Sequence, residues 1–350
     1  MELLSLLEQS PAFFIATVSV VGLMVGSFLN VVIHRLPIMM QREWQTQARD
    51  FLELEHPADQ ETLTLSTPAS RCPHCGHKIR FYENVPVLSY IWLRGKCSAC
   101  GTPISVRYPL VELLTGVLSA IVAWHFGFGW QAGAALALTW ALIALSMIDI
   151  DHQLLPDSIT LPFLWLGLLL SLFPVFADMH ASLIGAVAGY LSLWSVYQLF
   201  KLLTGKEGMG YGDFKLLALL GAWMGWQLLP MIVLLSSAVG AVLGGAVMIV
   251  KGRGRHQPMP FGPYLAIAGW IALLWGDRIS SAYLRWSGLG GCHAVLPARR
   301  PDGGHRQRQE RSGPPVRPPG RHCHRHRPDR PRAGGARPAR ADRNRCRLRR

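Results

Sequence analysis

Long apolar blocks alternate with short polar segments along most of the chain. Each block approaches the length of a membrane-spanning helix, although several are near the short limit. The blocks cover residues 11–33, 110–126, 131–148, 159–176, 182–203, 214–229, 231–250 and 262–276. Because half of all residues are hydrophobic and they gather in these blocks, the pattern predicts an all-α polytopic membrane protein with about eight transmembrane helices.

One large polar segment, residues 34–109, interrupts this pattern after the first block. It contains nine Lys or Arg residues, and basic residues near membrane helices are typical of cytoplasmic loops. The first ten residues carry two glutamates and no Lys or Arg, so the first block is predicted to be a retained helix and not a secretory signal. We therefore predict a first transmembrane helix (1–33), a cytoplasmic loop (34–109) and a membrane core of seven helices (110–289).

The formal net charge of +14 does not belong to the membrane body. From Gly291 onward there are 18 Arg and 4 acidic residues, which leaves 17 basic and 17 acidic side chains for residues 1–290. The segment 290–350 is rich in Arg, Pro and Gly and is predicted to be disordered. It would lie outside the cytoplasm after eight spans, which disfavours a nucleic-acid-binding arm. GC-rich codons give such a mixture, so we expect a wrong-frame extension that resequencing the coding region would reveal.

Two matching C-x-x-C-G motifs lie in the polar loop. Their cysteines are Cys72, Cys75, Cys97 and Cys100. Four thiolates presented in pairs by two short turns are typical of a structural zinc site, which has no open coordination position. A reducing cytoplasmic loop disfavours disulfides. His74 and His77 could each replace a ligand, but the four cysteines already complete the zinc site.

Acidic residues occur at two places where apolar blocks meet polar segments. Asp149 is the deepest of three acids at the end of the third block, and Asp213 lies at the start of the sixth. Carboxylates at a bilayer edge suggest function, and both would lie on the same face of the membrane. If the two meet, they cannot both ionise easily, and they would share one proton as a unit. One could then act as a base on water while the protonated one polarises a carbonyl, which is the chemistry of an aspartic protease.

The neighbouring polar residues have structural alternatives. Asp213 could pair with Lys215 or cap its own helix, and Asp157 could be a helix N-cap or a substrate contact. Asp151 could be solvated or contact a charged substrate. For Asn30, within the first block, an interhelical hydrogen bond is the favoured interpretation.

The chain resembles the type IV prepilin leader peptidase/N-methyltransferase family over nearly all of residues 1–289. The motifs that carry this resemblance are residues 26–37 (GSFLNVVIHRLP), the paired C-x-x-C loop, 107–112 (RYPLVE), 149–157, 210–213 (GYGD) and 260–263 (PFGP). The resemblance implies an inner-membrane enzyme that removes the basic leader of prepilins and pseudopilins at the cytoplasmic face. It places the catalytic pair at Asp149 and Asp213.

The resemblance also implies a second activity, methylation of the new N-terminal amine, usually of Phe, with S-adenosylmethionine. The family's methyl transfer is tied to the first loop, which here includes Gly95 and Lys96. No familiar glycine-rich donor motif appears in the sequence. The partners that it implies are prepilins, pseudopilins and the lipid bilayer, with no nucleic acid.

Three other interpretations compete with this one. A general intramembrane aspartyl protease would share the Gly-Asp motif but would not need the large cysteine loop. An ion-coupled transporter could use Asp149 and Asp213, but it would place acids near the membrane midplane and show repeated halves. A membrane scaffold would leave the two matched acids unexplained.

Overall fold

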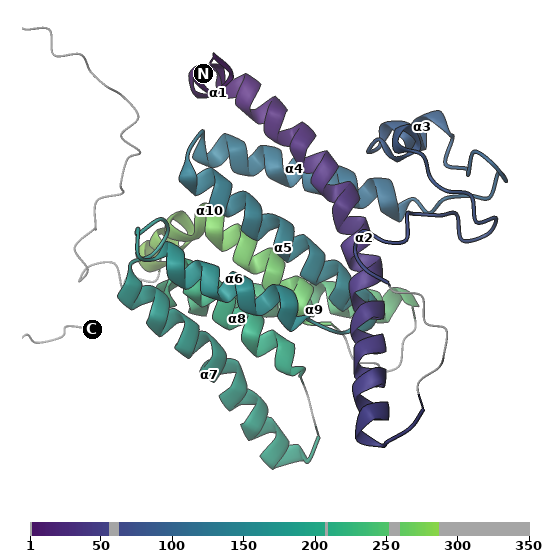
Figure 1. The fold of residues 1–350 in the computed structure, drawn as a ribbon. Helices are drawn as coiled ribbons and strands as arrows, with labels where there is room; N and C mark the ends of the chain where they lie inside the picture. The colour runs from purple at the N-terminus through teal and green to yellow at the C-terminus, as the bar shows by residue number, and fades with distance from the viewer. Residues whose placement is uncertain (1, 56–62, 207–208, 252–259, 287–350) are drawn as a thin grey trace, which may run out of the picture. The chain divides into compact units, whose positions relative to one another are not determined.

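The computed structural model describes residues 2–55, 63–206, 209–251 and 260–286. Within these residues it contains helices, turns and two isolated β-bridges, and no strand, so the all-α prediction is confirmed (Figure 1). The elements are α1 (Glu2–Gln9), α2 (Pro11–Phe51), η1 (Phe81–Asn84), α3 (Leu88–Trp92), α4 (Arg107–Phe126), α5 (Trp130–His152), α6 (Asp157–Leu170), α7 (Met179–Thr204), α8 (Tyr211–Met224), η2 (Trp226–Leu228), α9 (Leu229–Lys251) and α10 (Gly262–Trp286). The predicted tail, 290–350, lies outside the described residues.

The first apolar block forms only part of a much longer helix. The Oγ of Ser10 caps α2 by accepting a hydrogen bond from the backbone of Phe13 (3.4 Å), and Pro11 follows at the favoured first helical position. The helix then continues past the block's end at Ile33 as far as Phe51, about 27 Å further at 1.5 Å per residue. Hydropathy marks where lipid contact ends, whereas a helix can continue into water.

Among the described residues, four helices are long and apolar enough to cross a membrane: α2, α4, α5 and α7. Helix α6 and residues 226–242 form shorter apolar helices. The total of about eight spans therefore stays a prediction.

The prediction of a membrane-length helix over residues 214–229 is wrong. Helix α8 has 14 residues and ends at Met224, because Gly225 adopts a positive φ of 81° and a short 3-10 turn follows. A glycine readily takes this conformation, and hydropathy alone does not register the break.

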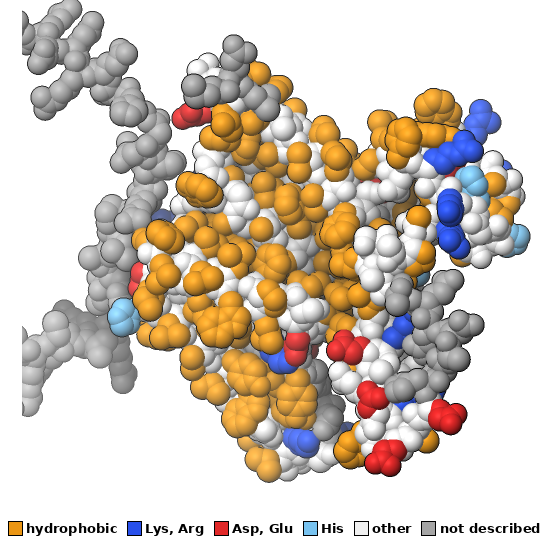
Figure 2. All heavy atoms as spheres, in the orientation of Figure 1, with side chains coloured by type: hydrophobic (Ala, Val, Ile, Leu, Met, Phe, Trp, Pro, Cys, Tyr) orange, Lys and Arg blue, Asp and Glu red, His pale blue; other side chains and the backbone are white. Residues whose placement is uncertain are grey.

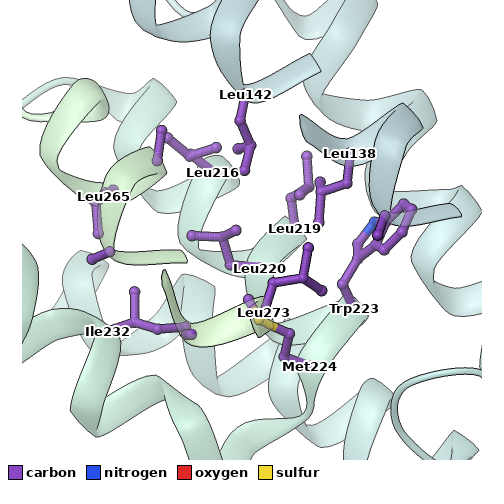
Figure 3. Close-up of a cluster of buried hydrophobic side chains, with 14 of the residues drawn as sticks. Leu138, Leu142, Leu216, Leu219, Leu220, Trp223, Met224, Ile232, Leu265 and Leu273 are labelled. Carbon is purple, nitrogen blue, oxygen red and sulfur yellow. The ribbon is translucent and has the colours of Figure 1, made fainter. Parts of the chain in front are cut away.

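Helix α8 lies at the centre of the core although it is short. It is apolar on all sides, and its residues from Leu216 to Met224 are buried throughout, as expected of a helix surrounded by others. Figure 3 shows its side chains meeting those of α5, α9 and α10, including Leu138, Ile232 and Leu265. The core thus fixes the axis of the helix that carries Asp213.

Small residues allow α7 and α8 to pack closely. A Cβ added to Gly185 would collide with the backbone of Gly221, and one added to Gly189 would lie 2.6 Å from the carbonyl oxygen of Leu217. The Oγ of Ser182 donates to the carbonyl of Ala222 at 2.5 Å. Close backbone approach through small residues is a common way for helices to associate in lipid.

Helices α2 and α4 pack in the same way. A Cβ on Gly26 would lie 2.7 Å from the Cα of Glu112. One turn further along α2, the Nδ2 of Asn30 donates to the carbonyl of Tyr108 on α4 (3.1 Å). The interhelical hydrogen bond predicted for Asn30 is therefore confirmed.

Candidate active site and metal centre

Asp149 lies in the last turn of α5. Its side chain is buried, and its Oδ2 accepts a hydrogen bond from the backbone N–H of Gly262, the first residue of α10, at 3.0 Å. The helix ends just beyond it, because Gln153 takes a left-handed conformation. The backbone N–H at the start of α10 thus holds one oxygen of this carboxylate in place.

Asp213 lies in the first turn of α8 and is equally buried. Gly210 is the N-cap residue, and its carbonyl accepts a hydrogen bond from the backbone N–H of Asp213 at 3.2 Å. A carboxylate in a first turn is also favoured by the helix dipole. A capping role for Asp213 therefore fits this position. A catalytic role depends on how close Asp149 lies.

The fold brings Asp149 and Asp213 together. Leu155 packs between two glycines beside the carboxylates: Gly212, which precedes Asp213, and Gly262, which binds Asp149. A Cβ on Gly212 would lie 2.7 Å from the Cβ of Leu155, and one on Gly262 would lie 3.3 Å from its Cδ1. Two buried carboxylates that are 64 positions apart in the sequence thus lie in one packed region at one end of the bundle.

Lys215 does not pair with Asp213. Its Nζ contacts both carboxylate oxygens of Asp157 at 2.7 Å, which joins the start of α6 to the start of α8. Asp157 is the first residue of α6 and Pro156 is its N-cap, so the N-cap role considered for Asp157 is wrong. Within the described residues, this ion pair leaves the Asp149–Asp213 pair without a lysine neighbour from α8.

Lys215→Met should leave any activity that depends on Asp213 within a few-fold of the wild type. The ion pair is partly exposed, and such pairs contribute about 0.2–1 kcal/mol to stability. Thermal unfolding and activity of the variant in detergent would check this. A loss of activity as large as that of Asp213→Ala would instead assign Lys215 to the site.

A second ion pair lies beside Asp149. Arg107 at the start of α4 binds Asp151 through two hydrogen bonds, Nη1 to Oδ1 at 2.7 Å and Nη2 to Oδ2 at 2.5 Å. Neither of the roles considered for Asp151 included this partner. The signal was present in the sequence, because consecutive antiparallel helices bring the start of one near the end of the next.

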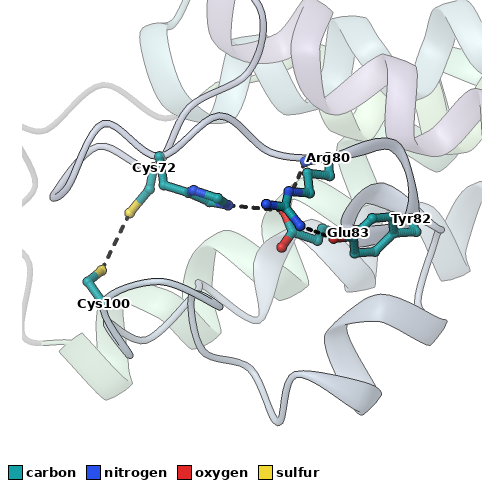
Figure 4. A network of polar contacts seen from close by, with 6 residues as sticks. Cys72, Arg80, Tyr82, Glu83 and Cys100 are labelled. Carbon is teal, nitrogen blue, oxygen red and sulfur yellow. Dashed lines mark hydrogen bonds and ion pairs between the residues drawn. The ribbon is translucent and has the colours of Figure 1, made fainter.

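The four loop cysteines form one cluster. The sulfur atoms of Cys72, Cys75, Cys97 and Cys100 all lie within 4.8 Å of one another, and those of Cys72 and Cys100 are 3.9 Å apart (Figure 4). A tetrahedral zinc ion with Zn–S bonds of about 2.3 Å requires sulfur atoms about 3.8 Å apart. The cysteines are all free thiols, so the donor set fits zinc, which would tie the two motifs together.

The two C-x-x-C-G motifs have the same backbone geometry. In each, the first cysteine's N–H donates to the carbonyl five residues on, and the glycine's N–H donates to the first cysteine's carbonyl, all at 2.9 Å. Gly76 and Gly101 have φ values of +71° and +73°, which explains the glycine at these positions. A hydrogen bond with Thr102 (3.2 Å) lowers the pKa of the Cys100 thiol to about 6, whereas the pKa of the Cys75 thiol in the same cluster is raised to about 11.

Polar contacts support the first motif from outside the sulfur cluster. The Glu83 carboxylate accepts a hydrogen bond from the backbone N–H of Arg80 (2.9 Å; Figure 4), which lowers the pKa of Glu83. The same carboxylate lies 3.3 Å from His77 Nε2. His77 is therefore engaged by a carboxylate. It and His74 are not part of the described cysteine cluster.

Gly95 has a structural explanation of its own. It has a φ of +68°, and a Cβ there would lie 2.8 Å from the hydroxyl of Tyr90. Its carbonyl accepts a hydrogen bond from Ile104 (2.7 Å), and Lys96 forms a β-bridge with Pro103. Both residues thus build the second turn, next to Cys97.

Comparison with known proteins identifies relatives that match this chain over nearly their full length. Residues 20–126 match the model of the bacterial peptidase A24 N-terminal domain, and residues 136–245 match the type IV leader peptidase family. The prepilin leader peptidase/N-methyltransferase of Stutzerimonas stutzeri is 64% identical over 283 residues, 81% of this chain and 98% of that protein. The protein of the same name from Pseudomonas aeruginosa is 60% identical over 289 residues, 83% of this chain and all of that protein. No solved structure matches the chain significantly.

Proposed function

The chain belongs to the type IV leader peptidase family, and from this premise we propose that it cleaves prepilin leaders and then methylates the new N-terminus. The observation that supports the cleavage reaction best is the pair of buried carboxylates, Asp149 and Asp213, that separate helices bring together. We further propose that pseudopilins of type II secretion are substrates and that the site faces the cytoplasm from the inner membrane. Arg and Lys residues that flank the same ends of the helices support this orientation.

Two neighbouring carboxylates share one proton in the proposed mechanism. The ionised carboxylate takes a proton from a water molecule, and the protonated one donates a hydrogen bond to the scissile carbonyl. The N–H of Gly262 keeps the Asp149 oxygen that it binds from rotating away. A prepilin has a basic leader before an apolar helix, so its cleavage point would lie at the membrane edge, where these acids are placed.

For the methyl transfer we propose a donor and a region of the chain, and not a set of catalytic residues. The relatives' name includes N-methyltransferase, and S-adenosylmethionine is the proposed methyl donor. Gly95 and Lys96 stay the proposed neighbourhood of its site. Their position in the turn beside Cys97 supports a shared dependence of donor binding on the folded cysteine loop.

The proposed function is tested by incubating the detergent-solubilised protein with a purified prepilin and weighing the products. Leader removal by the wild type and not by Asp213→Ala is the expected result. A further mass of one methyl group should appear only when S-adenosylmethionine is added. A well-folded, zinc-loaded protein that leaves prepilin intact would contradict the proposal.

Cys72→Ser should lose bound zinc while keeping its membrane core. The remaining three sulfur ligands bind zinc more weakly, and structural zinc sites contribute directly to folding. We expect about one zinc per wild-type chain and a several-fold lower content in the variant, measured by elemental analysis. The loop should become more sensitive to trypsin, whereas Ser98→Ala, between the second pair of cysteines, should keep the metal. Full zinc content in Cys72→Ser would contradict the four-cysteine site.

A further inference from the structure

Helix α3 presents its apolar face outward. Leu88, Ile91 and Trp92 follow the spacing of one helical face and are 65%, 66% and 87% exposed. Figure 2 shows hydrophobic side chains gathered at the position of α3, with Lys and Arg side chains beside them. An exposed apolar face rimmed by polar residues marks an interaction surface.

The opposite side of α3 is already bound to the rest of the loop. The Tyr90 hydroxyl donates to the carbonyl of Ile104 at 3.3 Å, and the Tyr90 carbonyl accepts from Gly95 at 2.9 Å. The helix therefore cannot turn its apolar face inward without breaking these contacts.

Hydrogen bonding also fixes the depth of α3. The backbone N–H of Val87, the residue before α3, donates to Oε2 of the buried Glu112 at 2.8 Å. Glu112 lies five residues into α4 from Arg107, about 7.5 Å along the helix axis. Since Arg107 pairs with Asp151 at the polar level, α3 begins below that level, beside a membrane-spanning helix.

The lipid-facing side of α4 is apolar at the same level. Leu110, Leu113 and Leu114 of α4 are exposed in the isolated protein, as expected of residues that face lipid chains. Because Val87 binds Glu112, the start of α3 lies at the level of this surface, and we expect the exposed face of α3 to meet the same layer of the bilayer.

Charge in this part of the loop suits a membrane surface. Residues 63–106 contain five basic side chains and one acidic side chain, Glu83. Arg94 and Lys96 follow directly after α3 and are exposed. Basic side chains next to an apolar face are typical of helices that bind anionic lipid headgroups.

We propose that α3 is an interfacial anchor, which inserts Leu88, Ile91 and Trp92 into the headgroup region of the leaflet where α4 begins. Interfacial helices bury their apolar face by about 5–10 Å, which agrees with the depth given by Glu112. A tryptophan at this level also fits the aromatic belt of membrane proteins. The anchor holds the cysteine loop against the membrane surface at the foot of α4, and it does so independently of any catalytic role of the aspartates.

Photocrosslinking in lipid nanodiscs tests this proposal. The probe is p-benzoylphenylalanine at position 92, in nanodiscs of phosphatidylethanolamine and phosphatidylglycerol. Phe51 provides a matched control, because it is also an aromatic residue with 87% exposure but lies at the far end of α2. The same probe at Leu113 on the lipid-facing side of α4 is the positive control.

The expected result is a lipid adduct, identified by mass, from positions 92 and 113 and none from position 51. No lipid adduct at 92 while 113 reacts would overturn the proposal. So would a crosslink from 92 to a second copy of the chain, or equal lipid adducts at 51 and 92. Because the substitution keeps an exposed aromatic side chain, a folding defect is not expected, and zinc content checks that the loop is intact.

Discussion

Asp149→Asn should reduce prepilin cleavage by about 10³-fold or more, since proton transfer by a positioned side chain contributes about 10²–10⁴-fold and the proposed dyad supplies it twice. Asparagine has the same shape as aspartate, and its Oδ1 can still accept the hydrogen bond that Gly262 now donates at 3.0 Å. The packing around the site should therefore persist. What the variant loses is the carboxylate that shares a proton with Asp213.

The measurement is the initial rate of leader removal, read by mass, with membrane insertion and zinc content as checks of folding. Asp151→Asn is the matched control, because Asp151 lies two residues further along the same helix end and pairs with Arg107. That variant should keep cleavage within about tenfold, since the ion pair is partly exposed. An Asp149→Asn protein with more than a tenth of wild-type activity would refute the proposed dyad.

The sequence predicted two acids at matching depth, because depth is inferred from hydropathy. Asp149 ends one apolar block and Asp213 begins another, and charge at the block ends puts both on one face. The sequence could not tell how α5 and α8 pack laterally, so it could not show that they meet. That information comes from α8 being buried on all sides and from Leu155 packing between Gly212 and Gly262.

The cysteine cluster was the most predictable part of the loop. Short motifs such as residues 72–76 and 97–101 fix their own turn geometry, because the hydrogen bonds that form each turn lie within six residues. The role of Glu112 was not predictable in the same way. Its partners, Val87 and Gly26, are distant in sequence, and nothing in the local pattern around 107–112 indicates them.

The partners of the two ion pairs were likewise not predicted from the sequence. Asp157 and Asp151 were recognised as polar residues near the candidate site, but their partners, Lys215 and Arg107, depend on which helix ends lie side by side. Alternating helix direction would have suggested Arg107 for Asp151. No comparable rule links α6 to α8, because α7 separates them in the chain.

Gly262→Ala should lower cleavage by about 10²-fold, the cost expected when a catalytic group moves by about 1 Å. A Cβ at this position would lie 2.6 Å from Oδ2 of Asp149 and 3.2 Å from its Cγ, so the carboxylate must move away from its backbone donor. The backbone of Gly262 is not in the left-handed region, so alanine should adopt the same backbone conformation at the helix start. The effect would therefore come from displacement of Asp149 and not from a misfolded α10.

Gly210→Ala provides the matched control for this prediction. Gly210 also precedes a helix beside the dyad. Among the described residues, a Cβ there would meet only Oδ2 of Asp213, at an ordinary 3.9 Å, and its φ of −77° is compatible with alanine. Its cleavage rate should stay within a few-fold of the wild type, and both variants should bind equal zinc. If Gly262→Ala cleaves as fast as Gly210→Ala, the close approach of α10 does not position Asp149. A loss in both would mean that the helix starts, and not the Asp149 contact, limit the reaction.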